Sequence, residues 1–383
     1  MKNQISITSI SSISAIGNDP KIIWENYLNQ KHFFEEANFN KTLVAPIDKI
    51  SEHIISNLKN SDHKYKSLDK SVLLAIAVSR DAVRKADWKS EDNFGINLGS
   101  SRGATELFEK NYHDFILTGK ANVLSSPTTT LGNISSWVAH DLQSQGPEIS
   151  HSITCSTALH ALLNGVVWLQ SGMANKFLVG GSEAALTPFT IAQMQAMKIY
   201  AKTNQEYPCQ AMNFDKKLNT MILGEGASVC CLEMGKKPNA LATIEGIGYA
   251  TEILEHNSSI SAEAICFQKS MRMALQNTDV KHVDVIVMHA PGTVKGDLSE
   301  MKAIEKVFGQ KMPLLTNNKW KIGHTLGVSG MLSIEFAIMM MQNQVFVGVP
   351  FLEAKTQAKS IQKVLVNSVG FGGNAVSVLL SLQ

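Results

Sequence analysis

Charged residues are scarce in this sequence. Asp, Glu, Lys and Arg make up 18% of the 383 residues, and the formal net charge is only +2. A nearly neutral chain lacks the dense basic surface of a dedicated nucleic-acid binder, so we exclude that class of protein. With 44% hydrophobic residues, the chain can bury one large core or two domains fused into one. The low charge also indicates that much of the surface packs internally or against another subunit.

Cysteines are few, and their pattern excludes two classes of site. Their number is odd and none belongs to a Cys-x-x-Cys pair, which argues against a disulfide framework and against a zinc site. This usage is typical of the reducing cytoplasm, so we expect a cytoplasmic protein without a bound metal. The five cysteines are Cys155, Cys209, Cys230, Cys231 and Cys266.

Long unbroken hydrophobic runs are missing as well. The N-terminal stretch MKNQISITSISSISAIGN alternates polar and apolar residues like a strand and lacks the apolar core of a secretion signal. Residues 331–349 are apolar, but Glu335 and the polar run 342–344 interrupt them. We therefore expect no membrane span.

Cys155 stands where an apolar strand pattern gives way to a long helix pattern. The surrounding sequence is ISHSITCSTALHALLNGVVWLQSG, with a turn-like stretch at 154–157. A thiol at a helix N-terminus lies near unpaired N–H groups and the positive end of the helix dipole, and both favour the thiolate. Cys155 is therefore a candidate nucleophile. The alternative is an inert buried cysteine, because free Cys is among the most buried residue types.

Two histidines further along have comparable contexts. His289 ends the apolar run 283–288 and precedes Pro-Gly, whereas His324 follows Gly323 ahead of another helix-like apolar stretch. A lone histidine is usually a core or surface residue. However, α/β sheets gather active-site groups at the carboxyl ends of their strands. We therefore interpret both histidines as residues at strand exits that share a site with Cys155.

The order of these patterns repeats along the chain. A helix pattern and a short apolar strand follow both Cys155 and His324, and each set closes on a glycine-rich turn and an apolar strand. We interpret this parallel as an internal duplication with halves 1–235 and 240–383. Strands that alternate with helix patterns also indicate a layered α/β fold.

Seven segments in a fixed order resemble the β-ketoacyl-acyl-carrier-protein synthases, the condensing enzymes of the thiolase superfamily, over nearly the whole chain. The resemblance implies a five-layered α-β-α-β-α fold with two mixed sheets around central helices. It also implies a dimer, either a homodimer or a heterodimer with a ketosynthase-like partner. The segments are ITSISSISAIGN, GINLGSSRG, the Cys155 segment, NFDKKLNTMILGEGA, HAPGTVKGD, KWKIGHTLGVSG and NSVGFGGNA.

The resemblance further implies a reaction. Elongating condensing enzymes use Cys-His-His, whereas priming enzymes have asparagine in place of the second histidine, so His324 places this chain in the elongating group. In that chemistry Cys155 takes an acyl chain from a carrier thioester. His289 and His324, both neutral, then stabilise the enolate left when a malonyl-carrier thioester loses CO₂. No organic cofactor is implied, because the phosphopantetheine arm arrives with the acyl carrier protein.

Supporting roles follow from the resemblance one residue at a time. Lys319 matches the structural lysine of the family, and Glu300 is its expected ion-pair partner. Phe371 matches the gating phenylalanine, and its backbone N–H is expected to form an oxyanion hole with that of Cys155. Thr293 matches the threonine that contacts the pantetheine arm.

A docking surface for the carrier protein is expected near the cavity entrance. Because carrier proteins are acidic, this surface should offer lysines. Lys64 and Lys66 precede a helix that resembles the docking region of the family, and Lys216 and Lys217 are a second candidate pair. The alternative for each lysine is an ordinary solvated surface charge.

Several positions depart from the family pattern. The first threonine of the common His-Gly-Thr-x-Thr is Pro291, and the residue before the nucleophile is Thr154 in place of alanine. The glutamate usually found nine residues beyond the second histidine is Ser333, with Glu335 two residues further on. These changes spare the Cys-His-His set. They indicate a specialised pathway, of which polyene or aryl-polyene pigment synthesis is one example.

Two other functions remain open. A chain-length-determining partner subunit has the same fold but typically lacks the nucleophilic cysteine, so the presence of Cys155 favours an active subunit. The segment GSSRG at 99–103 fits the G-x-S-x-G elbow of a serine hydrolase with Ser101 as nucleophile. That function would leave the contexts of Cys155 and the two histidines unexplained.

Overall fold

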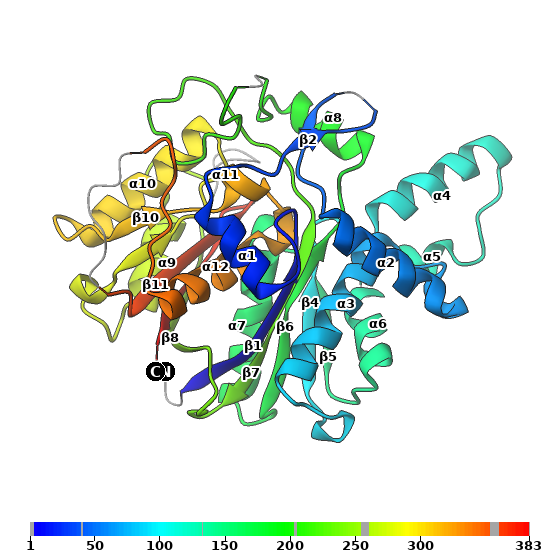
Figure 1. Ribbon diagram of the computed structural model, residues 1–383, viewed down its shortest axis with the longest axis horizontal. Coiled ribbons are helices and arrows are strands. Elements are labelled where there is room, and N and C mark those ends of the chain that lie inside the picture. The colour runs from blue at the N-terminus through cyan, green and yellow to red at the C-terminus, as the bar shows by residue number, and fades with distance from the viewer. Residues whose placement is uncertain are drawn as a thin grey trace.

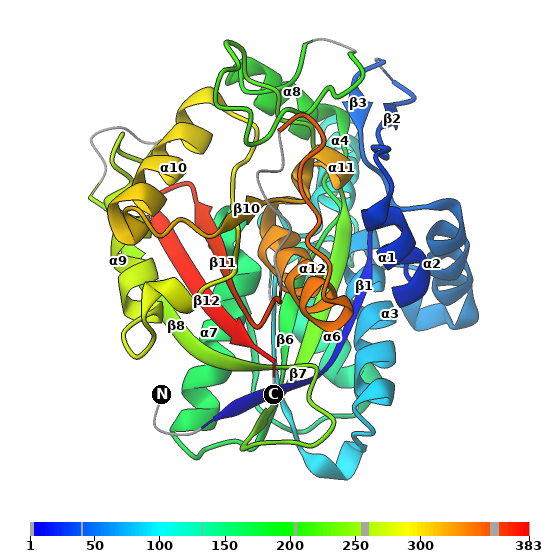
Figure 2. The ribbon, with the colours of Figure 1, turned by 60° about the vertical axis from the view of Figure 1, so that its left-hand side comes forward.

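Helices and sheets alternate in five layers in the computed structural model of the protein (Figures 1 and 2). The central layer consists of α7 (Thr157–Gln170) and α12 (Ser329–Asn343), which both contact strands of the two large sheets. The expected thiolase-like α/β fold is therefore confirmed. The structure describes residues 4–39, 41–131, 133–202, 205–253, 260–352 and 360–382.

The first sheet comes from the N-terminal half and has the strand order β1-β7-β6-β4-β5. Strand β4 is parallel to β5 and β6, whereas β7 is antiparallel to β6 and β1. The edge strand β5 leads directly towards Cys155. The strands are β1 (Ile5–Ile13), β4 (Gly95–Gly99), β5 (Glu148–His151), β6 (Lys176–Glu183) and β7 (Gly226–Met234).

The second sheet repeats this plan with strands of the C-terminal half, in the order β10-β9-β11-β12-β8. Read from β10, two parallel pairs are followed by two antiparallel pairs, as in the first sheet read from β5. The shared pairing pattern is what an internal duplication produces. The strands are β8 (Ala242–Thr251), β9 (Val285–Val287), β10 (Leu314–Thr316), β11 (Lys363–Gly370) and β12 (Asn374–Ser381).

Other helices cover the outer faces of the sheets. Helices α3 and α6 pack on the first sheet, and α9 packs on the second with α10 beside it. Helices α4 and α5 extend from the body as an arm (Figure 1). The bounds are α1 (Pro20–Leu28), α2 (Lys49–Ser61), α3 (Lys70–Lys85), α4 (Thr105–Thr118), α5 (Ser125–Thr129), α6 (Asn133–Leu142), α8 (Pro188–Ala196), α9 (Ile265–Ala274), α10 (Val294–Phe308) and α11 (Lys319–Ile322). A small hairpin pairs β2 (Glu35–Glu36) with β3 (Leu43–Val44).

Strand β1 shows how the sequence pattern fits this architecture. It alternates isoleucine with polar residues, yet every residue is buried, because the central layer covers one face and α3 the other. The hydroxyls of Ser9 and Ser11 donate hydrogen bonds to Ala82 O and to the carboxylate of Asp81, both at 2.7 Å. Small hydroxyl side chains therefore pack against a helix without leaving buried polar groups unpaired.

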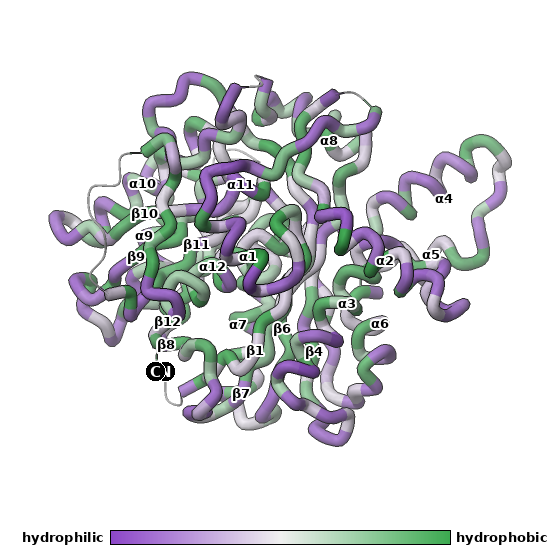
Figure 3. Tube along the Cα trace, viewed as in Figure 1, coloured by the Kyte–Doolittle hydropathy of each residue, from purple (hydrophilic) through white to green (hydrophobic). Residues whose placement is uncertain are grey.

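The apolar run 331–349 belongs largely to α12, which is buried on all sides down to Met341. A helix that is apolar all round is typical of a buried core helix as well as of a membrane span. Here two sheets flank it, which explains its composition (Figure 3). Within the described ranges, no helix is long and apolar enough to cross a membrane, and no cluster of His, Cys, Asp and Glu side chains could hold a metal ion.

Candidate active site

The predicted order of strand, turn and helix around Cys155 is confirmed. Strand β5 is followed by a single 3₁₀ turn, η3 (Thr154–Ser156), and α7 begins directly after it. Thr154 has a φ of 46°, a left-handed conformation that is costly for a β-branched residue. The hydroxyl of Thr157 donates to Thr154 O at 2.6 Å, and the hydroxyl of Ser368 donates to Cys155 O at 3.1 Å. These bonds hold the strained turn that carries the nucleophile.

The resting nucleophile is a thiol and not a thiolate. Burial raises the pKa of Cys155 to about 12, the negative charge of Glu183 adds to the rise, and the positive charge of Lys319 opposes it. A rise of this size corresponds to about 4 kcal/mol. A helix N-terminus offers at most about 2 kcal/mol in the other direction. Desolvation therefore acts against the expected preference for the thiolate in the resting site, and it exceeds what the helix dipole can supply.

His289 and His324 lie together at the nucleophile. Their ring centroids are 5.3 Å apart and the ring planes are nearly perpendicular. Both rings line the same cavity as Cys155, which has a volume of about 700 Å³. The prediction that these three residues share one site therefore agrees with the geometry.

Both imidazoles are neutral. Burial lowers the pKa of His324 to about 3 and that of His289 well below its usual range, and the positive charge of Lys319 acts in the same direction. A neutral ring carries one N–H donor and one lone pair. The Nδ1 atom of His324 is buried without a hydrogen-bond partner in the described part of the chain. The two rings can therefore offer N–H donors to a substrate oxygen without adding a full charge to the cavity.

The backbone at His289 is held by a buried carboxylate. His289 follows β9, and the Glu300 carboxylate accepts its N–H at 2.9 Å and that of Ala290 at 2.8 Å. Ala290 has a left-handed φ of 22°, so these two hydrogen bonds also stabilise a strained residue. The side-chain amide of Asn367 donates a third hydrogen bond to Glu300 at 3.2 Å.

The expected direct ion pair between Lys319 and Glu300 is not formed. Among the described residues, no carboxylate oxygen lies within 4 Å of the Lys319 ammonium, although both side chains are buried. Burial raises the pKa of Glu300 and lowers that of Lys319, and the attraction between the two charges opposes both shifts. Glu300 instead directs its hydrogen bonds to the backbone that positions His289.

His324 is reached by a helix and not by a strand, which corrects the expected placement. It follows α11, and its backbone forms an isolated parallel bridge with Leu223. Its N–H donates to Ile222 O at 2.7 Å, and its carbonyl accepts from Gly224 N at 3.1 Å. Gly323 has a φ of +70°, and a Cβ there would lie 2.9 Å from Ile222 O, so only glycine allows this close approach.

Glu183 is a further buried carboxylate, and the sequence patterns missed it. It ends β6 and accepts the N–H groups of Ser101 at 2.8 Å, Arg102 at 3.1 Å and Gly327 at 2.9 Å, along with the Ser100 hydroxyl at 2.9 Å. Its signal in the sequence is a charged residue at the end of the apolar strand pattern KFLVGGSEA.

The GSSRG segment is explained by this carboxylate. Its backbone N–H groups surround Glu183, and Ser101 is not among the described residues that line the Cys155 cavity. The segment therefore positions a buried charge beside the nucleophile. Ser101 lines a separate pocket of about 520 Å³, but no histidine is among the described residues that line it, so the serine hydrolase alternative lacks a histidine general base there.

Phe371 and Thr293 both line the cavity. Phe371 lies in the turn between β11 and β12 and is 39% exposed. Gly370, beside it, packs so closely on η3 that a Cβ would lie 2.1 Å from the hydroxyl oxygen of Thr154. Thr293 caps α10, because its hydroxyl accepts the N–H of Gly296 at 3.2 Å. Its predicted contact with a substrate arm would add to this structural role.

The candidate docking lysines divide into three groups. Lys64 and Lys66 are exposed but lie at the 3₁₀ turn before α3 and do not line the cavity. Lys216 is buried in an ion pair with Asp297 at 2.6 Å, so its predicted docking role is wrong. Lys217, by contrast, is exposed at the cavity.

Three more exposed lysines line the cavity, and sequence reasoning missed them. They surround an opening in which, among the described lining residues, no Asp or Glu occurs. Such an entrance favours an anionic substrate. The three are Lys198, Lys202 and Lys295.

The substitutions near His324 also have a structural account. Glu335 does not replace the missing glutamate, because it accepts a hydrogen bond from the Ser12 hydroxyl of β1 at 2.6 Å and does not line the cavity. The Ser333 hydroxyl donates to Ser329 O at 3.0 Å within α12. Both side chains thus make structural bonds.

This geometry defines an acyl-transfer site of the thiolase type, with a thiol nucleophile and two neutral imidazoles in one buried cavity. The model of the β-ketoacyl synthase N-terminal domain matches residues 2–237, and that of the C-terminal domain matches residues 241–353. The chain therefore belongs to the β-ketoacyl synthase family, whose members are acyltransferases that carry out elongating condensations.

Similar proteins agree with this assignment. The chain is 27% identical to 3-oxoacyl-[acyl-carrier-protein] synthase 2 of Staphylococcus aureus (strain N315) over 421 aligned positions that cover 99% of each chain. A β-ketoacyl synthase from Burkholderia phymatum has the same fold, with a TM-score of 0.88, 20% identity and full coverage of both chains.

Two further solved structures share the fold and contain partners. A type II polyketide synthase acyl-carrier protein in complex with its ketosynthase gives a TM-score of 0.85 at 17% identity, with full coverage of both chains. A ketosynthase in complex with its chain length factor from Xenorhabdus doucetiae gives 0.80 at 18% identity, covering 100% of this chain and 98% of that one.

Proposed function

We propose that this chain catalyses the decarboxylative Claisen condensation of a malonyl-carrier thioester with an acyl chain held on Cys155. The reaction extends a fatty-acid or polyketide chain by two carbons. The observation that carries the proposal is that the buried side chains of Cys155, His289 and His324 line one cavity and that both imidazoles are neutral.

The first half-reaction is an acyl transfer. The Cys155 sulfur attacks the carbonyl of the acyl-carrier thioester, a new C–S bond forms, and the carrier thiol leaves. The proton of the Cys155 thiol passes overall to the departing carrier sulfur. Burial raises the pKa of Cys155, so little thiolate forms in the empty site. The thiol loses its proton mainly during the reaction, when the departing carrier sulfur can accept it. A resting thiol is thereby protected from unproductive reactions.

The second half-reaction needs stabilisation of negative oxygen. Loss of CO₂ from the malonyl thioester leaves an enolate, whose oxygen accepts N–H bonds from His289 and His324. The carbanion attacks the acyl-Cys155 carbonyl, a C–C bond forms, the acyl C–S bond breaks, and the Cys155 sulfur leaves as thiolate and takes a proton from water. The backbone N–H groups of Cys155 and Phe371 hold the tetrahedral oxygen of this step. Lys319 lowers the pKa of both histidines, and Glu300 holds the backbone at His289.

An acyl carrier protein is the proposed substrate donor. The four exposed lysines at the cavity suit the negatively charged phosphopantetheine arm, and Thr293 lies along the same wall. The arm arrives with the carrier, so the proposal requires no separate organic cofactor or metal. Docking of the acidic carrier on Lys64 and Lys66 predicts that reversing both to Glu raises the KM for the carrier substrate. Acylation of Cys155 by a small thioester should be unaffected, and an unchanged KM would remove this docking role.

A dimer in the cytoplasm is the proposed state of the protein. Strand β5 is an edge strand with only partly covered residues, and the α4–α5 arm exposes apolar side chains. Hydrophobic residues recur along this arm in Figure 3. Exposed apolar surface of this extent is typical of an interface. The strongest examples are Phe108, Tyr112, Ile116, Leu117 and Val123. Whether the partner is a second copy or a ketosynthase-like subunit is decided by mass measurements on the purified complex.

The alternative function is that of a silent chain-length-determining subunit. A solved ketosynthase with its chain length factor has this fold, which keeps the alternative open. The complete set of Cys155, His289 and His324 favours the active subunit, because a silent subunit has no need of a nucleophile.

The experiment is intact-mass spectrometry of the purified chain after incubation with an acyl-loaded carrier protein. We expect one acyl adduct on the native chain and none on the Cys155→Ala variant. No adduct on the native chain, with several acyl lengths and with a candidate partner subunit present, would contradict the proposed function and favour the silent subunit.

A further inference from the structure

Tyr200 separates the active-site cavity from a second pocket. The cavity at Cys155 has a volume of about 700 Å³, and the neighbouring pocket has about 440 Å³. Three residues line both, and all come from one short segment: Lys198, Tyr200 and Lys202. The two lysines are exposed, whereas Tyr200 is only 3% exposed. The tyrosine ring is therefore the buried part of the partition.

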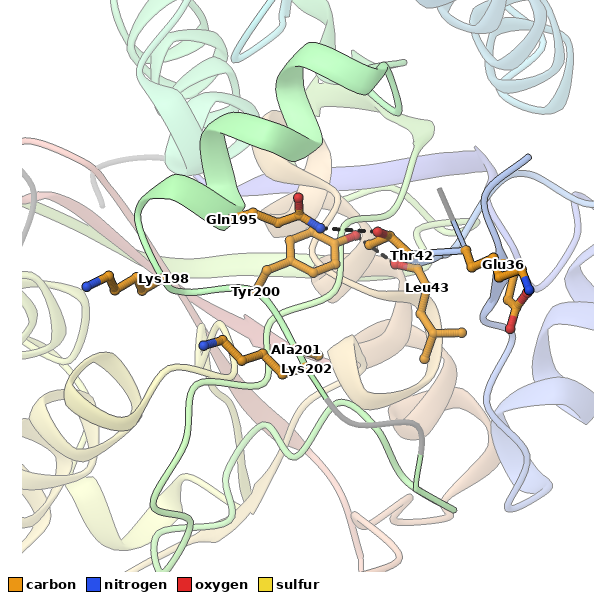
Figure 4. Close-up of a pocket in the computed structure, with 9 residues that line it drawn as sticks. Glu36, Thr42, Leu43, Gln195, Lys198, Tyr200, Ala201 and Lys202 are labelled. Carbon is orange, nitrogen blue, oxygen red and sulfur yellow. Dashed lines mark hydrogen bonds between the residues drawn. The ribbon is translucent and has the colours of Figure 1, made fainter. Parts of the chain in front are cut away.

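Hydrogen bonds fix this ring at its far end. The Tyr200 hydroxyl donates to Leu43 O at 2.7 Å and accepts the N–H of Leu223 at 3.2 Å. In Figure 4 the ring is directed at Leu43, whereas Lys198 and Lys202 extend to the other side. Moving the ring would take this partner from the buried N–H of Leu223 and from the partly buried carbonyl of Leu43, at a substantial cost. The partition is therefore a fixed wall.

The backbone on both sides of Tyr200 is fixed as well. Ala201 N donates to Met221 O at 2.8 Å, and Met221 N donates to Ile199 O at 3.3 Å. The side-chain amide of Gln195 donates to the Thr42 hydroxyl at 3.1 Å, which ties α8 to the hairpin of β2 and β3 (Figure 4). The wall thus joins α8, the hairpin and the segment that also positions His324.

The two sides of the wall differ in chemistry. Towards the nucleophile, Tyr200 belongs to one apolar cluster with Cys155, Met194, Met221 and Leu326. An acyl chain gains free energy by leaving water for such a surface, but it gains none beside charged and polar groups. The lining on the far side includes Glu36, Lys41, Thr42 and Gln195.

We propose that Tyr200 ends the acyl-binding part of the cavity and so limits the length of the acyl chain carried on Cys155. The inference rests on the proposed function, because it requires an acyl group on the thiol. A chain that extends from Cys155 along Met194 and Met221 meets the Tyr200 ring. Additional methylenes must fold back or displace a side chain held by two hydrogen bonds. One aromatic residue thus determines where the apolar channel stops.

The test uses Tyr200→Phe and Tyr200→Leu in the full chain. Each variant is incubated with saturated acyl-carrier thioesters that lengthen in two-carbon steps, and intact-mass spectrometry gives the rate of acylation of Cys155. Tyr200→Phe keeps the ring, so the longest chain accepted should stay the same. Tyr200→Leu should accept at least one further step, with loading of that chain accelerated a few-fold, because the vacated space can bury about one more methylene before the polar pocket begins. Short chains should load within a few-fold of wild type in both variants.

A matched control and a second substitution keep the test decisive. Tyr27 is equally buried, at 1% exposure, but lines neither cavity, so Tyr27→Leu should leave the length limit unchanged. If Tyr200→Leu does not fold, Tyr200→Trp decides the question, because its larger ring should shorten the longest chain accepted. An unchanged limit in folded Tyr200→Leu or Tyr200→Trp would overturn the inference. Failure of the proposed function gives a different result, because the wild type would then accept no acyl chain of any length.

Discussion

Opposite charges keep the nucleophile and the two histidines uncharged. On the cysteine side, burial and the carboxylate of Glu183 raise the pKa of Cys155. On the histidine side, burial and the ammonium of Lys319 lower the pKa of His289 and His324. Glu183 opposes ionisation of the thiol and Lys319 opposes ionisation of the imidazoles, although the charge of Lys319 also partly offsets the rise in the pKa of Cys155. The resting site therefore contains three neutral groups, and charge develops only during the reaction with substrate.

The two sides also differ in how they compensate buried charge. On the cysteine side, the partners of Glu183 among the described residues are N–H and hydroxyl donors. On the histidine side, Asp297 pairs with the ammonium of Lys216 and also accepts the backbone N–H groups of Met212 at 2.9 Å and Gly292 at 3.0 Å. The stabilisation of a buried carboxylate by several backbone donors depends on the conformation of the loops. Its stabilisation by an ion pair depends on one side chain, which a single substitution can remove. Substitution should therefore break the second arrangement more severely.

The largest expected effect is the loss of this ion pair. Lys216→Met leaves Asp297 buried without its cation and should lower the free energy of unfolding by about 3–5 kcal/mol. Lys217→Met is the matched control, because the neighbouring lysine is exposed and its loss should change stability by no more than about 0.5 kcal/mol. Urea unfolding of both variants measures the difference. Equal stability of the two would show that the buried pair contributes nothing.

The next effect separates the two half-reactions. His289→Ala and His324→Ala each remove one N–H donor to the enolate and should slow condensation by about 10²–10³-fold. Acyl transfer to Cys155 should change by only a few-fold, because it does not use the enolate site. His282→Ala, at an exposed histidine, is the control and should retain full activity. An equal loss in acyl transfer and condensation would contradict the assignment of the two rings to the enolate.

Acid should weaken the fold through the buried histidines. Burial lowers the pKa of His324 from 6.5 to about 3, so between these values the unfolded chain binds a proton that the native state does not. Unfolding is therefore favoured as the pH falls, and His324 contributes about 1.4 kcal/mol per pH unit in this window and nothing above it. Denaturant unfolding from about pH 7 to 5 should show a shallower slope for His324→Asn than for wild type. Parallel curves would mean that the pKa of His324 is not lowered in the native state.

The smallest expected effect concerns the thiol. Glu183→Gln removes the negative charge beside Cys155, so the pKa of the thiol should fall and alkylation by iodoacetamide at fixed pH should accelerate by a few-fold to about tenfold. Glu335→Gln is the control, because this carboxylate is also buried but bonds to Ser12 on β1. Equal alkylation rates in wild type and Glu183→Gln would show that desolvation alone sets the pKa of Cys155.

The sequence predicted the features that depend on order and spacing. The alternation of strands and helices, the turn that carries Cys155, and the grouping of Cys155 with His289 and His324 all follow from local patterns and family resemblance. The position of His324 after a helix was missed, because the four-residue helix α11 is too short to produce a periodic signal.

Features that depend on distant backbone groups could not be predicted. Glu300 bonds to main-chain N–H groups and not to Lys319, and Glu183 bonds to Gly327, 144 residues away. Backbone donors have no signature in a side-chain pattern. Burial is equally hidden, because Lys216 and Lys217 are adjacent and chemically identical, yet only the first is enclosed.

The bond from Glu183 to Gly327 has a consequence for the chain as a folding unit. It joins the end of β6 in the first half to η5 (Leu326–Val328) in the second, and the bridge between Leu223 and His324 joins the halves again. A fragment that stops before β8 would keep the nucleophile but expose the inner face of α7 and lose a donor to a buried carboxylate. Separately expressed halves should therefore remain unfolded alone and recover structure only when mixed, as in fragment complementation.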